Sequence, residues 1–205
     1  MASRPTGDVP RYRADAYASR ARPFYAGKDP AHGFGHVERM LARVPILAED
    51  DVPRWDLLYF LVCFHGLVPL LDDRAFLGET GRFLRGLGWN AVEAREGIAA
   101  LGRHLTAPVS LEEMLVHDAN YWEALGAFGI AKAFTTGGAR SQRIEETLRL
   151  ARQYVDRPVF RTRYAQRTAA ERRAYAHAFL DDLERELDGP SDRTAATGLS
   201  GPTPL

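Results

Sequence analysis

The sequence contains a single cysteine, Cys63, among its 205 residues. Disulfide bonds within the chain are therefore excluded, and because Cys63 lies in an apolar run, a buried thiol is expected. The longest apolar run, residues 57–68, is too short to cross a bilayer and contains His65. The first residues are polar and interrupted by proline, unlike a signal peptide. These features predict a cytoplasmic protein with no membrane partner.

The chain also lacks a net charge. Its 27 basic residues balance its 27 acidic residues, so no overall field attracts nucleic acid or an anionic membrane. Nucleic acid is therefore not expected as a partner, and an anionic ligand must be held by local groups. Only two basic residues are lysines, Lys28 and Lys132, which we attribute to a GC-rich genome. The expected partner is a small molecule, and self-association is left open.

Strand patterns are missing as well. No segment alternates convincingly between apolar and polar residues, and we find no internal repeat. Hydrophobic residues make up 45% of the chain and aromatic residues 10%, enough for one full core. The predicted fold class is all-α, a single compact helical bundle over residues 9–189. Residues 1–8 are expected to be flexible, and the tail of residues 190–205 is expected from its composition to be disordered.

Apolar spacing and capping residues predict the helices. The first predicted helix covers residues 11–25, where Pro23 disturbs the pattern, and the second covers residues 35–45, with Pro45 at a kink or at the end. A central apolar helix follows over residues 55–67, with Pro53 in its first turn. Further helices follow a cap at Asp72 or Asp73, a cap at Asn90, and a capping box at Ser110 and Glu113. A break is predicted at 126–129, a loop at 135–138, and the last two helices at 141–155 and 168–187.

Two histidines four residues apart, His32 and His36, precede an apolar helix in the segment 29–40, DPAHGFGHVERM. Three later fragments belong with them: FHG at 64–66, the segment 98–104 that ends in His104, and DANYWEALGAFGIAKAFTTGG at 118–138. In order and spacing these fragments resemble the motifs of the HD-domain metal-dependent phosphohydrolases, especially the small bacterial branch that acts on nucleotides. The resemblance implies a helical HD fold and a hydrolase-like enzyme that acts on a small, phosphorylated metabolite.

In that family a histidine, a later His-Asp pair and a final aspartate bind one divalent cation. By this resemblance His36 matches the first ligand and His65 the second. Gly66 stands where the aspartate of the pair belongs, and Asn120 stands where the final aspartate belongs. The implied metal ligands are therefore His36, His65 and Asn120.

The two substitutions remove both negative charges from the implied metal site. Each carboxylate would attract a dication by several kcal/mol even at an effective dielectric constant of about 20, whereas imidazole and amide ligands are neutral. A divalent cation, whether Mn²⁺, Mg²⁺, iron or Zn²⁺, is therefore expected to bind weakly or not at all. Asp118 could replace Asn120 only in an irregular helix, because residues two apart on a helix point to different faces.

The candidate site residues follow from these motifs. The predicted catalytic residues are His36, His65 and Asp118, and the predicted substrate-binding residues are His32, His104, Lys132, Tyr121 and Trp122. Lys132 can hold a phosphate as a charge-assisted donor or be an ordinary surface charge. The two aromatic residues either stack on a ligand or fill the volume that a metal would take.

Three functions remain open from the sequence. The first is an HD-type phosphohydrolase with a loosely held metal ion. The second is a repurposed enzyme of a specialised biosynthetic pathway, in which His36, His65 and Asp118 act as acid and base groups without a metal. The third is a non-catalytic protein of this fold that binds a ligand or regulates a partner. The fold does not choose among them, and we favour an enzyme.

Overall fold

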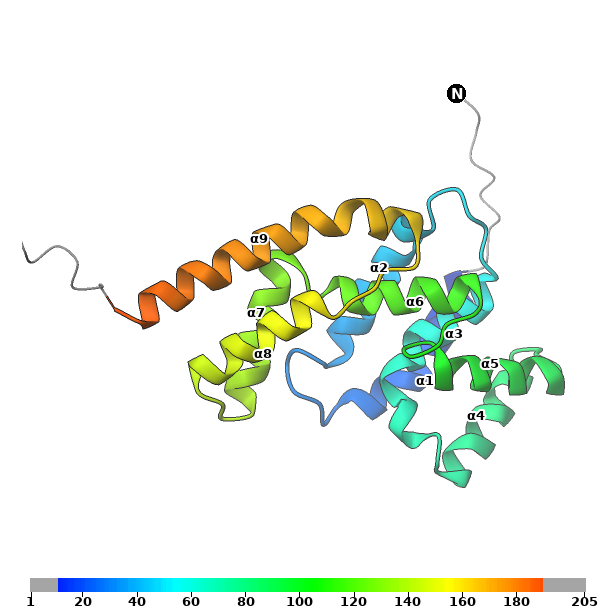
Figure 1. Ribbon diagram of the computed structural model, residues 1–205. Helices are drawn as coiled ribbons and strands as arrows, with labels where there is room; N and C mark the ends of the chain where they lie inside the picture. Colours follow the sequence, from blue (N-terminus) through cyan, green and yellow to red (C-terminus); the bar gives the residue numbers. More distant parts are fainter. Residues whose placement is uncertain (1–10, 190–205) are drawn as a thin grey trace, which may run out of the picture.

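The computed structural model describes residues 11–189, and this part of the chain is built from helices without any strand (Figure 1). The all-α class predicted from the sequence is confirmed. The elements in chain order are α1 (Arg11–Ala21), η1 (Arg22–Tyr25), α2 (Phe34–Ala48), α3 (Trp55–Phe64), η2 (His65–Leu70), α4 (Arg74–Gly86), α5 (Ala91–Arg103), α6 (Leu111–Trp122), α7 (Gly126–Ala139), α8 (Ile144–Asp156) and α9 (Arg163–Leu187). The terminal segments predicted to be flexible or disordered, 1–8 and 190–205, lie outside the described residues.

Helix α3 occupies the centre of the fold, as its apolar sequence predicts. It contacts α1, α2, α5 and α6, and most of its side chains, Cys63 among them, are fully buried. Around it, α4 and α5 lie at one end of the molecule, and α7 and α8 lie at the other (Figure 1). No helix in residues 11–189 has both the length and the apolar character needed to span a membrane.

Both ends of α3 differ from the prediction. The α-helix stops at Phe64 and gives way to the 3₁₀ helix η2, which contains Pro69. Proline cannot donate to the carbonyl group four residues earlier, here that of His65, so an α-helix cannot continue through it. At the other end Pro53 lies before the helix rather than in its first turn, and the Arg54 backbone N–H donates to the Glu112 carboxylate at 2.7 Å.

Two predicted helix caps are confirmed. The Asp73 carboxylate accepts hydrogen bonds from the first turn of α4. Asn90 forms a full capping box with Glu93, in which each side chain accepts from the other residue's backbone N–H. At Ser110 only half of the predicted box forms, because the side chain of Glu113 binds Arg103 and a neighbouring backbone N–H instead.

The glycines near the end of α7 do not form the predicted loop. Residues 135–138 are helical, so the predicted loop is wrong. A Cβ atom at Gly137 would lie only 2.2 Å from Thr147 Oγ1 on α8. Glycine is needed here because the two helices approach closely. Helix α2 similarly continues for one turn past Pro45, and α9 begins at Arg163, earlier than predicted.

The Asn90 cap can be tested by mutation. Asn90→Ala removes the acceptor for two backbone N–H groups at the start of α5 and is expected to lower the free energy of unfolding by about 1 kcal/mol. Urea denaturation measures this difference. Val92→Ala, an exposed change in the same turn, is the control and should change stability by less than about 0.5 kcal/mol. Equal effects of the two variants would contradict a stabilising cap.

Candidate functional site

A pocket of about 190 Å³ lies between the end of α6, helix α7, helix α8 and the turn before α2. Four residues predicted from the sequence line it: His32, Asn120, Tyr121 and Lys132. The remaining polar lining side chains are Glu123, Thr136, Arg140 and Tyr154. Because histidine, amide, ammonium and guanidinium groups meet in a partly apolar hollow, the pocket has the composition of a small-molecule site.

The carboxylate of Glu123 organises the buried side of this pocket. Its side chain is only 1% exposed, and it accepts hydrogen bonds from His36 Nδ1 at 2.7 Å, Arg39 Nε at 2.7 Å and Lys132 Nζ at 3.2 Å. These partners come from α2 and α7. A buried carboxylate is stable only when it is paired and hydrogen-bonded, and Glu123 meets that requirement with three donors.

The pKa of Glu123 reflects this pairing. Burial by itself would raise the pKa of the carboxyl group, but hydrogen bonds from His36 and Arg39, together with the positive charge of Lys132, hold that pKa well below its ordinary value. The group is therefore ionised at neutral pH. Burial acts in the opposite sense on Lys132, where it lowers the pKa of the ammonium group although Glu123 partly compensates.

His36 lies at the centre of the predicted metal site. Its Nε2 atom is 3.0 Å from Asn120 Oδ1, and its ring lies 4.8 Å from that of His65, almost perpendicular to it. The structure thus brings together His36, His65 and Asn120, the three predicted ligands. An oxygen atom faces each ring nitrogen of His36, which a protonated imidazole satisfies with two N–H donors.

His65 is a buried histidine whose Nδ1–H donates to the Val62 carbonyl at 2.7 Å. Burial, followed by the nearby His36, lowers its pKa well below the ordinary value. The ring is therefore neutral at physiological pH, with a lone pair on Nε2. A neutral imidazole can accept a proton or bind a metal ion.

The donor set does not fit a tightly bound divalent cation. Within the described part of the chain, no group of three or more His, Cys, Asp or Glu side chains is placed to hold a metal ion. His36, His65 and Asn120 supply no formal negative charge, and Glu123, the nearest carboxylate, is already shared among three donors. Metal sites for hard dications depend on carboxylate ligands, which this cluster lacks.

Asp118, predicted to be catalytic, has a different set of partners. Its buried carboxylate accepts from the Thr162 backbone N–H at 2.7 Å, the Thr162 hydroxyl at 2.8 Å and the Arg161 backbone N–H at 2.9 Å. His117 Nδ1 is a further neighbour at 2.8 Å. These contacts tie α6 to the segment before α9. The carboxylate is therefore occupied away from the pocket, and the structure does not support the predicted catalytic role of Asp118.

Trp122 also lies in the core rather than in the pocket, so its predicted ligand contact is corrected. It is 4% exposed and packs against Phe160 and Tyr164 at centroid distances of 5.7 and 5.9 Å. Its neighbour Tyr121 does line the pocket. Since consecutive residues of a helix face different directions, only one of this aromatic pair can face a ligand.

His104 is fully buried and does not line the pocket, contrary to the predicted substrate contact. Its Nδ1–H donates to the Leu101 carbonyl at 2.7 Å, and its Nε2 atom has no hydrogen-bond partner in the described structure. Burial lowers its pKa to about 4. His104 is thus a neutral core histidine near physiological pH.

Three residues of the site were not predicted from the sequence. Glu123 occupies the acidic position of the motif after Asn120, which was a usable signal. Arg39 lies three residues after His36, so both can reach one face of α2. Lys28 donates to the Gly66 carbonyl at 2.6 Å, and no local sequence pattern predicts a contact between residues 38 positions apart.

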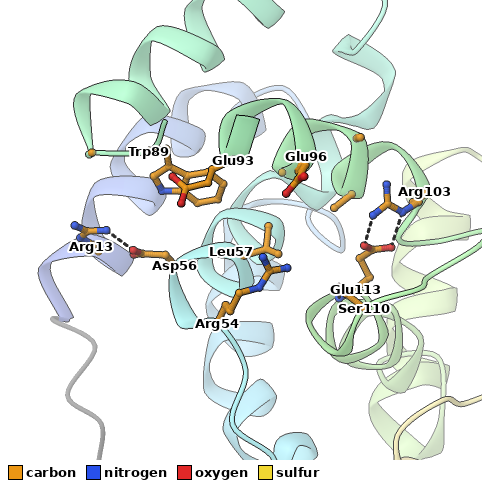
Figure 2. A pocket seen from close by; sticks show the side chains of 14 residues that line it. Arg13, Arg54, Asp56, Leu57, Trp89, Glu93, Glu96, Arg103, Ser110 and Glu113 are labelled. Carbon is orange, nitrogen blue, oxygen red and sulfur yellow. Dashed lines mark hydrogen bonds and ion pairs between the residues drawn. The ribbon is translucent and has the colours of Figure 1, made fainter. Parts of the chain in front are cut away.

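A larger hollow, of about 620 Å³, lies elsewhere, between α1, α3, α5 and α6. Figure 2 shows two ion pairs among its charged side chains, Arg13 with Asp56 and Arg103 with Glu113. No histidine lines it. Because these ion pairs join neighbouring helices, we interpret the charges of this hollow as structural. We therefore assign the candidate site to the smaller pocket beside His36.

No protein-family model matches this sequence, and no curated protein is significantly similar to it. Solved structures are similar over most of the chain. YpgQ of Bacillus subtilis, solved in complex with ADP, is 22% identical with a TM-score of 0.67, covering 87% of this chain and 97% of that one. An HD-superfamily hydrolase of Bacillus thuringiensis is 19% identical with a TM-score of 0.66, covering 87% of this chain and 98% of that one.

A third structure, a predicted HD superfamily hydrolase from an uncultured Thermotogales bacterium, is 20% identical with a TM-score of 0.56, covering 86% of this chain and 92% of that one. These similarities show that the chain has the HD-domain fold, as the sequence motifs indicated. At these identities they establish the fold, and the chemistry has to be argued from the site itself.

The Glu123 cluster predicts a pH-dependent stability. Because folding lowers the pKa of Glu123 below its unfolded value of 4.5, its contribution is present above pH 4.5 and is lost as the pH falls further. Glu123→Gln is expected to lower the free energy of unfolding by about 3 kcal/mol at pH 7, and the difference from the parent should shrink below pH 4.5. Denaturation at several pH values, with the exposed change Glu96→Gln as control, checks this. A pH-independent difference would contradict it.

His104 predicts a second, separate pH effect. Its folded pKa of about 4 lies below its ordinary value of 6.5, so its contribution to stability is present above pH 6.5 and is lost between pH 6.5 and 4. The free energy of unfolding should rise with pH in this range, because unfolding takes up to about one extra proton at His104. His104→Asn is expected to remove this contribution to the slope. Leu84→Ala, a destabilising core change without a titrating group, should leave the slope unchanged. Identical slopes in the parent and His104→Asn would refute the assignment.

Proposed function

We propose that this protein is a hydrolase-like enzyme of HD fold that acts on a small phosphorylated metabolite and does not depend on a tightly bound divalent cation. The observation that carries this proposal is the buried chain of hydrogen bonds from Glu123 through His36 to Asn120. Asn120 lines the pocket, so this series of hydrogen bonds connects the negative charge of Glu123 to the place where a ligand would bind.

The pocket favours an anionic ligand. Lys132 and Arg140 both line it, as does His32. Glu123 and Asp29 carry two negative charges, and Arg39 and Lys132 bring two positive charges to the first of them. Arg140 adds a third positive charge at the pocket. The excess positive charge lies beside the pocket and attracts an anion. Arginine and lysine are also the side chains that form strong, charge-assisted hydrogen bonds to phosphate.

His36 is suited to proton transfer. Glu123 holds Nδ1, which orients the ring. Protonated His36 can donate its Nε2 proton to the leaving oxygen of a phosphate ester when the substrate displaces the side chain of Asn120. Neither His36 nor His65 lines the pocket in this structure, so the ligand must reach them past Asn120. His65, kept neutral by burial, can then accept a proton from the water that attacks phosphorus while His36 protonates the leaving oxygen, and a proton returns from His65 to His36 through solvent before the next turnover.

The size of the pocket limits the substrate. Ligand pockets commonly measure roughly 300–1,000 Å³, and this one measures about 190 Å³. The structural relative YpgQ was solved with ADP, which supports a phosphate-bearing ligand here too. Since the volume is smaller, we infer a metabolite smaller than a nucleotide.

Metal independence follows from the charges of the site. The two carboxylates expected for a metal centre of this fold are replaced by Gly66 and Asn120, and Asp118 does not compensate for them. The protein must therefore use side-chain charges where a metal-dependent relative would use the cation. This makes acid and base catalysis by His36 and His65 the central expectation.

The proposal is tested by measuring phosphate release from a panel of small phosphorylated metabolites in the presence of EDTA. Activity is expected to persist in EDTA and not to rise with added Mn²⁺. His36→Asn is expected to lower kcat at least about 100-fold, because the proton donor is lost. Lys132→Met is expected to raise KM about tenfold, the loss of roughly one charge-assisted hydrogen bond.

His177→Asn, a change at a half-buried histidine on α9 outside the pocket, is the matched control and should keep parental kcat and KM. Activity that appears only with Mn²⁺ would replace the proposal with a metal-dependent phosphohydrolase. Ligand binding without turnover, unaffected by His36→Asn, would identify a non-catalytic binding protein.

A further inference from the structure

The ammonium group of Lys28 lies beside Gly66, the residue that stands where the family resemblance places a metal-binding carboxylate. Its Nζ atom donates to the Gly66 carbonyl at 2.6 Å and lies 4.5 Å from the centre of the Tyr25 ring. The side chain is half-buried. It comes from the turn between η1 and α2, whereas Gly66 belongs to η2, so the contact joins two distant parts of the chain.

Gly66 leaves room for this ammonium group. A Cβ atom at Gly66 would lie 2.8 Å from Lys28 Nζ and 2.9 Å from the Tyr25 hydroxyl, too close for either group to remain. The hydroxyl is itself fixed, since it donates to the Cys63 carbonyl at 3.0 Å and accepts from the Gly66 backbone N–H at 3.1 Å. An aspartate at this position would therefore displace the Lys28 ammonium group from its observed place, and the two side chains could then pair.

Lys28 lies close to His65. Its Nζ atom contacts the carbonyl group of Gly66, the residue that follows His65, and the Tyr25 ring beneath it lies 6.3 Å from the His65 ring. A cation bound through His65 would be repelled by this ammonium group. The ammonium group thus opposes a dication at the site, in addition to the loss of the two carboxylates.

The composition of the chain points to the same residue. Only Lys28 and Lys132 among its 27 basic residues are lysines, and both lie at this cluster, beside Gly66 and Glu123 respectively. A general preference for arginine, which explains the other positions, does not explain why both exceptions lie here. The compact ammonium group is not interchangeable with the planar guanidinium group.

We propose that Lys28 is a built-in replacement for the metal ion, a fixed positive charge beside His65 that excludes divalent cations. This inference does not rest on the proposed function. The simpler alternative is that Lys28 only ties the turn before α2 to η2. Such a tie would affect stability without affecting metal affinity.

Metal binding by Lys28→Gln separates these two roles. Calorimetric titration with Zn²⁺ is expected to show at least about tenfold tighter binding than in the parent, because one repulsive charge is removed while the imidazoles remain. Lys28→Arg keeps the charge and should bind no tighter than the parent. The gain should disappear in Lys28→Gln with His65→Ala, which shows that the ion binds at this site. Affinities of the parent and Lys28→Gln within twofold of each other would overturn the proposal.

Restoring the carboxylates provides a second measurement. The variant Gly66→Asp with Asn120→Asp should take up little Mn²⁺, because the new aspartate at 66 pairs with Lys28. Adding Lys28→Ala should raise the Mn²⁺ content of the purified protein to about one equivalent, the stoichiometry of a single-cation site. Gly66→Ala is the control for steric disturbance without charge. Equal metal content with and without Lys28 would contradict the proposal, and if these variants do not fold, the Zn²⁺ titration decides.

These readouts do not require turnover, so an inactive parent protein would count against the proposed function and leave the role of Lys28 to be decided by the metal titrations.

Discussion

The site depends on one buried carboxylate, that of Glu123. It gathers His36 and Arg39 from α2 and Lys132 from α7, and so it fixes how these helices meet at the pocket. Removing water from a carboxylate costs several kcal/mol unless donors replace it. The packing of α2 against α6 and the orientation of His36 are therefore coupled, because the three donors can satisfy Glu123 only in this arrangement.

The charges around the histidines are inverted relative to a metal centre. The metal site expected from the sequence motifs would surround a cation with carboxylates, whereas here Lys132 and Arg39 share the buried carboxylate of Glu123 with His36. Gly66 and Lys28 are consistent with this arrangement, since the missing side chain leaves the space that the ammonium group fills.

Local patterns carried much of the fold. Apolar spacing located the helices, and the caps at Asp73 and Asn90 depend on backbone groups only two or three residues away, which is why they were predictable. The long apolar segment around Cys63 had to be central because no face of it tolerates water. The same reasoning failed at Gly137, where glycine serves close packing of α7 on α8 rather than a loop.

By itself, the sequence determined the helical class and the central helix, because helix periodicity is a local property. The expectation that His36, His65 and Asn120 meet came instead from the resemblance in motif order, because no local property places residues so far apart in the chain together. Only the tertiary structure decided which carboxylate serves the site. Asp118 and Glu123 are five residues apart, yet one caps the segment before α9 and the other binds a histidine 87 residues away. Buried polar groups take the partners that packing brings to them, and those partners are set by the assembled core.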